Sequence, residues 1–577
     1  MRRILIMIFI LLLSVVCWSY SFLNTQPRAT STSTSRPPTY TVIPPSSTST
    51  NTPTSTQVEA PKSTATFTPL PPAGSFTVLY HPDDVLYVGD QVSLEVISPS
   101  GINMNDASLL VQIDPPGGPV LGPVNFAPWG IQGRDEATLV WAWDTQVQEP
   151  GAHTLSFSVQ PQGYSWTEQV TLLPDEQMPP NQADASWAST QTQCCTVFYI
   201  THTASERDLS SLIGLIDEQA RLSMDEMGSN FTEPITITIL PRLLGHGGFT
   251  STDISVSYLD RNYAANSWQM VVHHEMIHTI DGHLGGDFRP NIFVEGLAVY
   301  MAGGHYKPEP FMPRAAALME KYLNMYIPLE SLADDFYASQ HEIGYLEGAS
   351  LIEYMVRTYG WEAFSAFYRD IHISQGENQS KAIDSALQSH FSISFAQLEK
   401  DFQAALSHEP DTLAWVDDVS FSVVYYDTLR HYQELLDPSA YFRTAWLMDN
   451  QAMRQRSIVA DYLRHPHTPQ NLAIETLFIT AGQQISKAQY SDASATLDII
   501  NAVLDNIELG FPDPFSIAKM SSDYFSISVL LQQQGYEVQS IDIDGNEAIA
   551  FASNSKEPAL LELHLTFSGS EWILSPL

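Results

Sequence analysis

Hydrophobic and polar residues alternate with a period of two between Phe76 and Pro174, and the alternation comes in short runs. Pro, Gly and Asp residues separate these runs, which are Val92–Ile97, Leu109–Ile113, Ala137–Trp143, His153–Val159 and Gln169–Leu173. Alternation places one side of a strand in a core and the other in water. Regular short strands of this kind predict an antiparallel β-sandwich at residues 76–174.

The pattern changes after residues 175–193, which are rich in Pro, Gln and Ser and are expected to be a linker. Two strand-like runs follow, Cys195–Ile200 and Ile235–Leu240, and between them Thr203 and Glu206 have the spacing of a capping box at the start of a helix. The run Ile254–Leu259 is expected to be an edge strand. Strands first and helices after predict an α+β unit at residues 194–408.

The helices of this unit are expected from Asn266 onward, where apolar residues recur at helical spacing. They are predicted from about 267 to 282, from about 290 to before 303, and at 312–322, 341–359 and 361–371, with a last helix introduced by Ser394 and Gln397. Residues 409–510 also read as helical, with 471–487 and 491–506 as a helical hairpin. Residues 511–577 read as a helix followed by strands around an Asp544-Gly545 turn, which predicts a small α+β C-terminal domain.

The N-terminus has the pattern of an export signal. Arg2 and Arg3 precede an apolar run from Ile4 to Trp18, so residues 1–22 are predicted to be a signal peptide or an N-terminal anchor. Cleavage, retention in the membrane and lipidation of Cys17 remain alternatives. Residues 23–75 are dominated by Ser, Thr and Pro, cannot bury enough apolar surface to fold, and are predicted to be a disordered stalk. The protein is therefore expected to be secreted or anchored on the extracellular face of the membrane.

Charge narrows the range of partners. With 26 Lys and Arg against 65 Asp and Glu, the formal net charge is −39. This excess of negative charge repels nucleic acids and anionic membrane surfaces. Besides Cys17 the chain has only Cys194 and Cys195, so no disulfide framework is expected. The simplest interpretation of this pair is two small apolar residues that open a strand, with a redox or metal role as the alternative.

One stretch carries candidate chemistry: His274-Glu275-Met276-Ile277-His278, an H-E-x-x-H segment. Histidines four apart on a helix lie on the same face and can bind one metal ion, and the glutamate between them suits a base acting on metal-activated water. A hydrolytic zinc site needs three protein ligands. The candidates for the third are Glu295 and His283, and Glu295 is favoured because Gly296 and Ala298 beside it would let two helices approach closely.

These segments resemble known families. Val272–His278 followed by Phe293-Val-Glu-Gly-Leu-Ala298 resembles the gluzincin zinc metallopeptidases, which are peptidase MA-like, and Tyr345-Leu-Glu-Gly-Ala-Ser350 is similar to the Tyr-x-x-Gly-Ala segment of the M1-type aminopeptidases. The resemblance covers roughly residues 194–408 and implies a zincin-like catalytic domain that hydrolyses peptides or proteins. It implies His274, His278 and Glu295 as ligands of one Zn²⁺ per chain, Glu275 as general base and Tyr345 as the donor to the transition state. The stretch from Trp143 to Gly151 resembles immunoglobulin-like modules of surface proteins.

One departure from the M1 pattern limits the expected specificity. The M1 group has a Gly-x-Met-Glu-Asn segment whose acid binds the free α-amine of the substrate, whereas the comparable segment here is Gly245-His-Gly-Gly-Phe249, without an acid. A peptidase of unknown specificity is therefore expected. His246 could touch substrate, His341 could replace Tyr345 as donor, and Asp281 could orient a ligand histidine or simply end a helix. The alternative function is a catalytically inactive surface binding or scaffold protein with a peptidase fold. The oligomeric state is left open.

Overall fold

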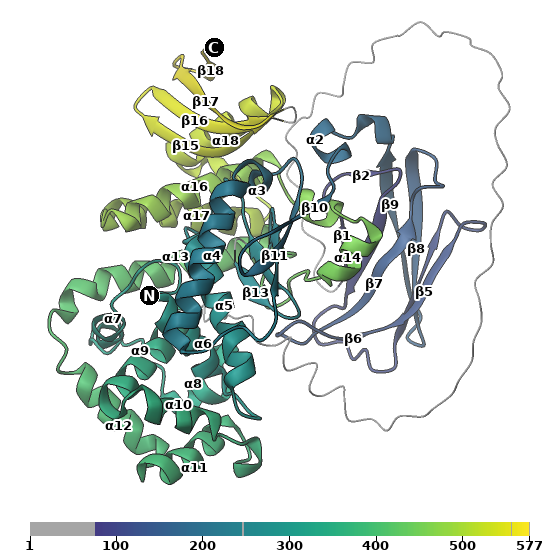
Figure 1. The fold of residues 1–577 in the computed structure, drawn as a ribbon. Helices are drawn as coiled ribbons and strands as arrows, with labels where there is room; N and C mark the ends of the chain where they lie inside the picture. Colours follow the sequence, from purple (N-terminus) through teal and green to yellow (C-terminus); the bar gives the residue numbers. More distant parts are fainter. Residues whose placement is uncertain (1–74, 245–246, 555–556, 576–577) are drawn as a thin grey trace, which may run out of the picture.

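The computed structural model describes residues 75–244, 247–554 and 557–575. Figure 1 shows a sheet-rich N-terminal region on the right, a helix-rich middle, and a C-terminal sheet at the top. The chain is thus a multidomain α+β protein. The predicted signal segment and residues 23–74 of the predicted stalk lie outside the described residues. Within the described ranges no helix combines the length and the apolar character needed to cross a bilayer.

Two sheets pack face to face in the N-terminal region. One has the strand order β1 (Thr77–His81), β3 (Gln91–Ile97), β7 (Arg134–Asp144), β6 (Ala127–Trp129). The other has the order β2 (Leu86–Tyr87), β9 (Tyr164–Leu173), β8 (Gly151–Gln160), β4 (Ser108–Ile113), β5 (Val120–Asn125). On β8, Leu155, Phe157 and Val159 are fully buried in the core between the sheets, while the residues between them are only partly covered.

The predicted sandwich is therefore confirmed, and the five predicted runs fall in β3, β4, β7, β8 and β9. Its pairings are antiparallel except that of β2 with β9, which is parallel. The immunoglobulin-like identity of the sandwich stays a prediction.

A second, mixed sheet forms the base of the middle region. Its strand order is β10 (Trp187–Gln191), β11 (Cys195–Ile200), β12 (Ile235–Leu240), β14 (Ile254–Ser257), β13 (Gly248–Thr250). The β11–β12 and β12–β14 pairings are parallel, and the two outer pairings are antiparallel. Cys194 and Cys195 form a disulfide with each other.

Two features of this sheet differ from the expectation. The run predicted as an edge strand forms the inner strand β14, and the edge position is taken by β13. β10 comes from the segment 175–193 that was expected to be a linker, which also contains η1 (Asp175–Gln177) and α2 (Pro180–Ala183). The prediction missed β13 and β10 because each is too short to show a clear alternation.

The capping box predicted at Thr203 and Glu206 is not formed. The Thr203 hydroxyl donates to the carbonyl of Ile200, and the Glu206 carboxylate accepts from the backbone N–H of His202. Both side chains therefore close the turn after β11. They precede the short helix α3 (Ala204–Arg207), and the long helix α4 (Leu209–Met227) begins later than expected.

Helices cover the mixed sheet and build the middle region. α4 and α5 (Trp268–Leu284) pack on the sheet, where Ile216, Val272 and Met276 share a core with Ile237 and Val256. The remaining helices form a second core and are α6 (Asn291–Ala302), α7 (Phe311–Leu318), α8 (Leu329–Asp334), η2 (Phe336–Ala338), α9 (His341–Tyr359), α10 (Trp361–Arg369), η3 (Ile373–Gln375), α11 (Gln379–Phe391) and α12 (Phe395–Leu406). The bounds of α9 agree with the prediction, α7 ends earlier, and α11 was not predicted.

The C-terminal third folds around one hydrophobic core. The elements of this part are η4 (Thr412–Trp415), α13 (Val416–Leu436), α16 (Pro469–Ser486), α17 (Tyr490–Glu508), η5 (Pro514–Ile517), α18 (Lys519–Gln533) and an antiparallel sheet of β15 (Tyr536–Asp544), β16 (Glu547–Asn554), β17 (Glu557–Phe567) and β18 (Trp572–Leu574). The predicted hairpin is formed by α16 and α17. Phe478 on α16 and Ile541 on β15 belong to the same core, so the helical region and the small C-terminal domain pack as one body.

The segment between α13 and α16 joins all three regions. It contains α14 (Asn450–Arg456) and α15 (Ala460–Leu463), and its residues Phe442 and Trp446 share a cluster with Leu240 of the mixed sheet and with Trp141 of the sandwich. The buried Arg464 donates to both carboxylate oxygens of Asp90, at 2.5 and 2.9 Å. This segment lies beside β1 and β10 in Figure 1 and holds the sandwich against the middle region.

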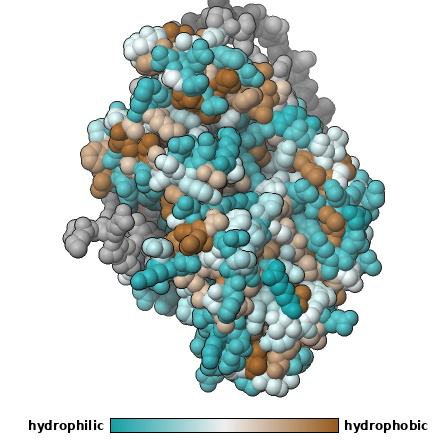
Figure 2. All heavy atoms as spheres, turned by 90° about the vertical axis from the view of Figure 1, so that its left-hand side faces the viewer, coloured by the Kyte–Doolittle hydropathy of each residue, from teal (hydrophilic) through white to brown (hydrophobic). Residues whose placement is uncertain are grey.

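The face of the molecule in Figure 2 is largely hydrophilic, with hydrophobic side chains in small separate groups. This distribution agrees with the net charge of −39. Charged and mixed surfaces of this kind favour solubility.

Candidate metal centre

Helix α5 positions the H-E-x-x-H residues because it is buried on several sides at once. Its residues Val272 and Met276 face the mixed sheet, and Ile277 and Ile280 face the helical core. A helix that is buried on almost all sides carries apolar residues around most of its circumference. The polar side chains of this stretch are therefore inside the protein, where each needs a partner.

Helix α6 brings Glu295 to the same place through a close contact with α9. A Cβ atom on Gly296 would lie 2.6 Å from the carbonyl carbon of Gly348 and 2.7 Å from its oxygen, so the two backbones nearly touch. The close approach expected from Gly296 is real, and its partner is α9. Because α9 also carries Tyr345, this contact couples the positions of Glu295 and Tyr345.

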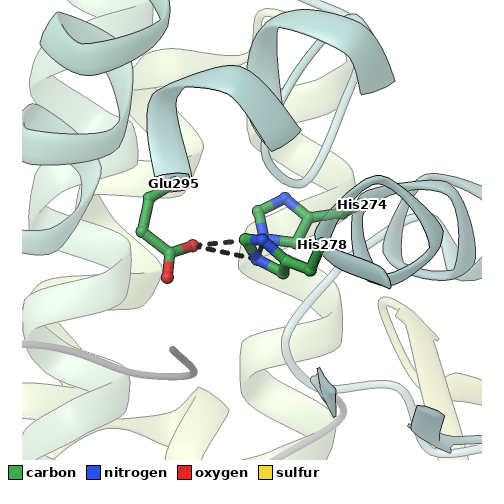
Figure 3. A group of neighbouring side chains, drawn as sticks. All are labelled: His274, His278 and Glu295. Atoms are coloured by element: carbon green, nitrogen blue, oxygen red, sulfur yellow. Dashed lines mark hydrogen bonds and ion pairs between the residues drawn. The ribbon is translucent and has the colours of Figure 1, made fainter. Parts of the chain in front are cut away.

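Three donor atoms converge between α5 and α6. The Nε2 atoms of His274 and His278 lie 2.9 Å apart, and each is 3.3 Å from Oε2 of Glu295. Figure 3 shows the Glu295 carboxylate pointing toward both imidazoles. Ligand atoms of a tetrahedral zinc ion with bonds of about 2.0–2.1 Å are about 3.4 Å apart. Oε2 of Glu295 is buried without a hydrogen-bond partner, and all three side chains are less than one-tenth exposed. A metal ion would satisfy all three atoms, so the residues fit zinc.

Glu295 is held in the ionised form that a metal needs. Burial opposes its ionisation, but the charge of His278 and the proximity of both histidines to the carboxylate outweigh burial and lower the pKa of Glu295. Its other oxygen, Oε1, accepts a hydrogen bond of 2.8 Å from the hydroxyl of Tyr337 in η2. Tyr337 was not predicted, because nothing in its local sequence sets it apart from other buried tyrosines.

Glu275 lies beside the metal ligands, next to the edge strand. It is 1% exposed, and burial raises its pKa to about 7. The Thr250 hydroxyl on β13 lies 2.8 Å from Oε2 of Glu275 and 3.0 Å from its carbonyl oxygen. The prediction also missed Thr250, which directly follows the glycine-rich segment 245–249. The hydroxyl can fix the orientation of the Glu275 carboxylate.

Tyr345 forms an aromatic cluster on the other side of the metal ligands. Its ring stacks on His305 at 4.1 Å, lies 4.5 Å from the ring of His341 and lies 6.4 Å from the ring of His274. Burial raises the pKa of Tyr345 well above its ordinary value, so the phenol keeps its proton. His305, which was not predicted, thus helps to position the predicted donor.

A cleft connects these groups. Its lining includes Gly248 from β13, His274 and Glu275 from α5, Tyr345 from α9, and Arg430 and Phe442 from the C-terminal third. His341 also lines the cleft, and its Nε2 lies 2.8 Å from the Tyr306 hydroxyl. The cleft is therefore lined by residues from three distant stretches of the chain.

The remaining candidates lie away from the ligands or outside the described residues. Asp281 accepts hydrogen bonds from Arg289 and Tyr368, at 2.8 and 2.9 Å, and not from a ligand histidine. The exposed His283 bonds to the carbonyl of Thr279, and of the two candidates for the third donor the structure brings Glu295 to the two histidines. His246 lies outside the described residues.

A second group of possible donors lies nearby. Oε1 of Glu342 is 3.5 Å from Nδ1 of His305 and 3.7 Å from Nε2 of His341. Burial raises the pKa of Glu342 to about 8, which leaves it largely protonated at neutral pH, and Arg314 and Arg430 place positive charge near it. This group suits a cation less well than the three atoms around Glu295.

Comparisons with known proteins add little to this geometry. No family model matches the chain, and no curated protein matches it. A crystal structure of an aminopeptidase N family protein from Idiomarina loihiensis overlaps 58% of this chain and 72% of its own, with 11% identity and a TM-score of 0.17. This overlap is too slight to carry an argument, so the function must be inferred from the site.

Proposed function

We propose that the protein is a zinc-dependent peptidase, a hydrolase with one Zn²⁺ per chain. The observation that carries the proposal is the convergence of His274, His278 and Glu295 on one point, beside a cleft lined by His274, Glu275 and Tyr345. We further propose that the protein is exported and acts on peptides or proteins, on the basis of the predicted signal segment and the negative net charge.

Each residue of the cleft has a role that its surroundings support. Zinc held by the three ligands would supply a Lewis acid that lowers the pKa of water to about 7 and polarises a carbonyl group. Glu275 would accept a proton from the attacking water at its carboxylate and pass that proton to the leaving amine. Its pKa of about 7 suits a group that must both take and release a proton at neutral pH. Thr250 holds the carboxylate in place during both transfers.

Tyr345 would stabilise the charge that develops on the carbonyl oxygen. Because burial keeps its phenol protonated, the hydroxyl can donate a hydrogen bond at any physiological pH. Losing one such donor costs about 3 kcal/mol of transition-state stabilisation.

The test is cleavage of a mixed peptide library by the zinc-loaded full-length protein, followed by mass spectrometry. We expect Glu275→Gln to lower cleavage about 10²- to 10⁴-fold, the usual contribution of a general base. Glu362→Gln, the same change at an exposed position on α10, should have no effect. A protein that binds zinc stoichiometrically but cleaves none of the peptides would instead be the inactive binding or scaffold protein.

A further inference from the structure

Arg430 lies in the cleft and has an unusual set of neighbours. It comes from α13 and is 6% exposed. Its Nη1 donates to Oε1 of Gln433 at 2.6 Å, its Nη2 donates to the hydroxyl of Tyr306 at 3.3 Å, and its guanidinium lies 4.7 Å from the ring of Phe442. Its Nε is buried without a partner. All these neighbours are uncharged.

Four other buried arginines in the described part of the chain have anionic partners. Arg242 pairs with Asp437, Arg261 with Glu475, Arg314 with Asp418, and Arg464 with Asp90. Carboxylates are plentiful, because the chain has 65 Asp and Glu against 26 Lys and Arg. A buried charge without a counter-charge is costly. No described residue forms an ion pair with Arg430, so the site suits an anion that a ligand brings.

Nearby carboxyl groups do not neutralise Arg430 fully. Burial raises the pKa of Glu342 to about 8 and that of Asp427 to about 7, although the charge of Arg430 itself opposes both shifts. At neutral pH Glu342 is largely protonated and Asp427 is about half protonated. They therefore leave Arg430 incompletely neutralised.

The polarity of the cleft points to the same kind of ligand. In its described lining Glu275 is the one carboxylate, and that group is assigned to proton transfer. A free α-amine of a substrate would find no further acid there, whereas a carboxylate would find Arg430. Guanidinium groups bind carboxylates through two parallel hydrogen bonds, which fixes both position and orientation.

We propose that Arg430 anchors a carboxylate of the substrate, an inference that rests on the proposed peptidase function. The substrate class is a peptide with either its C-terminal carboxylate or an Asp or Glu side chain near the bond to be cleaved. The anchor is coupled to the catalytic groups: the Tyr306 hydroxyl contacts both Arg430 and His341, and the His341 ring lies 4.5 Å from Tyr345. Binding at Arg430 would therefore set the substrate's position relative to Tyr345.

The test measures binding without turnover. The zinc-loaded, full-length Glu275→Gln protein is titrated calorimetrically with an acetylated alanine peptide, made as the free acid and as the C-terminal amide. Two further amidated peptides carry one Glu or the matching Gln. We expect the free acid, or the Glu peptide, to bind at least tenfold more tightly than its neutral counterpart, and the stronger preference identifies the source of the carboxylate.

Variants then locate the anchor. Arg430→Gln should abolish the preference and Arg430→Lys should retain part of it, because lysine keeps the charge without the planar fork. Arg456→Gln, which removes the same charge from an exposed residue stacked on Trp141 outside the cleft, should keep it. If Arg430→Gln does not fold, the preference for the charged over the neutral peptide is compared between the Arg430→Lys and parent proteins. A reduced preference in Arg430→Lys then supports the anchor, and an unchanged one contradicts it.

Equal binding of charged and neutral peptides, no binding of any peptide, or an equal loss for all peptides in Arg430→Gln would overturn the inference. Absence of cleavage by the unmodified protein would count against the peptidase function alone, because binding is measured in a protein that does not turn over.

Discussion

Replacing Gly296 by alanine should damage the metal centre from a position that supplies no donor atom. The new Cβ atom would lie 2.6 Å from the carbonyl carbon of Gly348, whereas ordinary contacts begin at 3.4 Å. Helices α6 and α9 would have to separate by about 0.8 Å, the difference between these values, if no other adjustment is made. Overpacking of this kind costs about 1–3 kcal/mol. Alanine regains about 1 kcal/mol of helix propensity. We therefore expect a net loss of up to about 2 kcal/mol in the free energy of unfolding.

The same displacement should weaken zinc binding, because Glu295 is the neighbouring residue and zinc ligands tolerate shifts of only about 0.2 Å. A loss of roughly tenfold or more in affinity is expected, as for changes to groups that support ligands. Urea unfolding and competition with a chelator measure the two effects. Gly214→Ala is the matched control, since a Cβ atom there meets nothing within 4 Å and the helix should gain stability. If Gly296→Ala matched this control in both measurements, the close contact between α6 and α9 would not position Glu295.

Three further changes probe other parts of the structure. Tyr345→Phe should lower kcat about 100-fold, or about 3 kcal/mol, and leave zinc affinity unchanged; unchanged kcat would remove the tyrosine from the mechanism. The pKa of Glu342 is about 8 in the folded protein and 4.5 in the unfolded chain. Its contribution to the free energy of unfolding is therefore fully present below pH 4.5 and is lost as the pH rises through 8. In urea unfolding, Glu342→Gln should therefore gain stability relative to the parent by a few kcal/mol between pH 5 and 9, and a constant difference would contradict the raised pKa. Arg464→Gln leaves Asp90 buried without its partner and should lower the free energy of unfolding by about 3–5 kcal/mol. The loss should appear as unfolding at lower urea concentration and as faster proteolysis near residue 464. An unchanged stability would show that this ion pair does not hold the sandwich in place.

The parts of the site that follow from local sequence were predicted. His274 and His278 share a helix face through their spacing alone, and the bounds of α9 were evident from its apolar periodicity and the glycine at its end. Glu295 was favoured because Gly296 and Ala298 beside it allow a close helix approach, and the role of Tyr345 was proposed from the resemblance to a known family. The structure brings Glu295 to the two histidines and places Tyr345 in the cleft that His274 also lines.

The missed parts depend on contacts between distant segments. Tyr337 and Arg430 reach the centre from later elements, and a single tyrosine or arginine has no periodic or spacing signal. The order of the strands was also hidden. Ser255 and Ser257 alternate with apolar residues as if they faced water, yet both are buried, and their hydroxyls contact Asn450 and the backbone N–H of Leu243. Polar residues satisfied by distant partners thus made an inner strand look like an edge strand.

The most direct test of the account is the zinc content and zinc affinity of the purified full-length protein and of two variants, Glu295→Gln and Glu342→Gln. The account predicts one zinc ion per chain in the unmodified protein and in Glu342→Gln, and a large loss of affinity in Glu295→Gln. If Glu295→Gln kept full affinity while Glu342→Gln lost its zinc, the metal would lie at His305 and His341, and the proposed centre on α5 and α6 would be wrong.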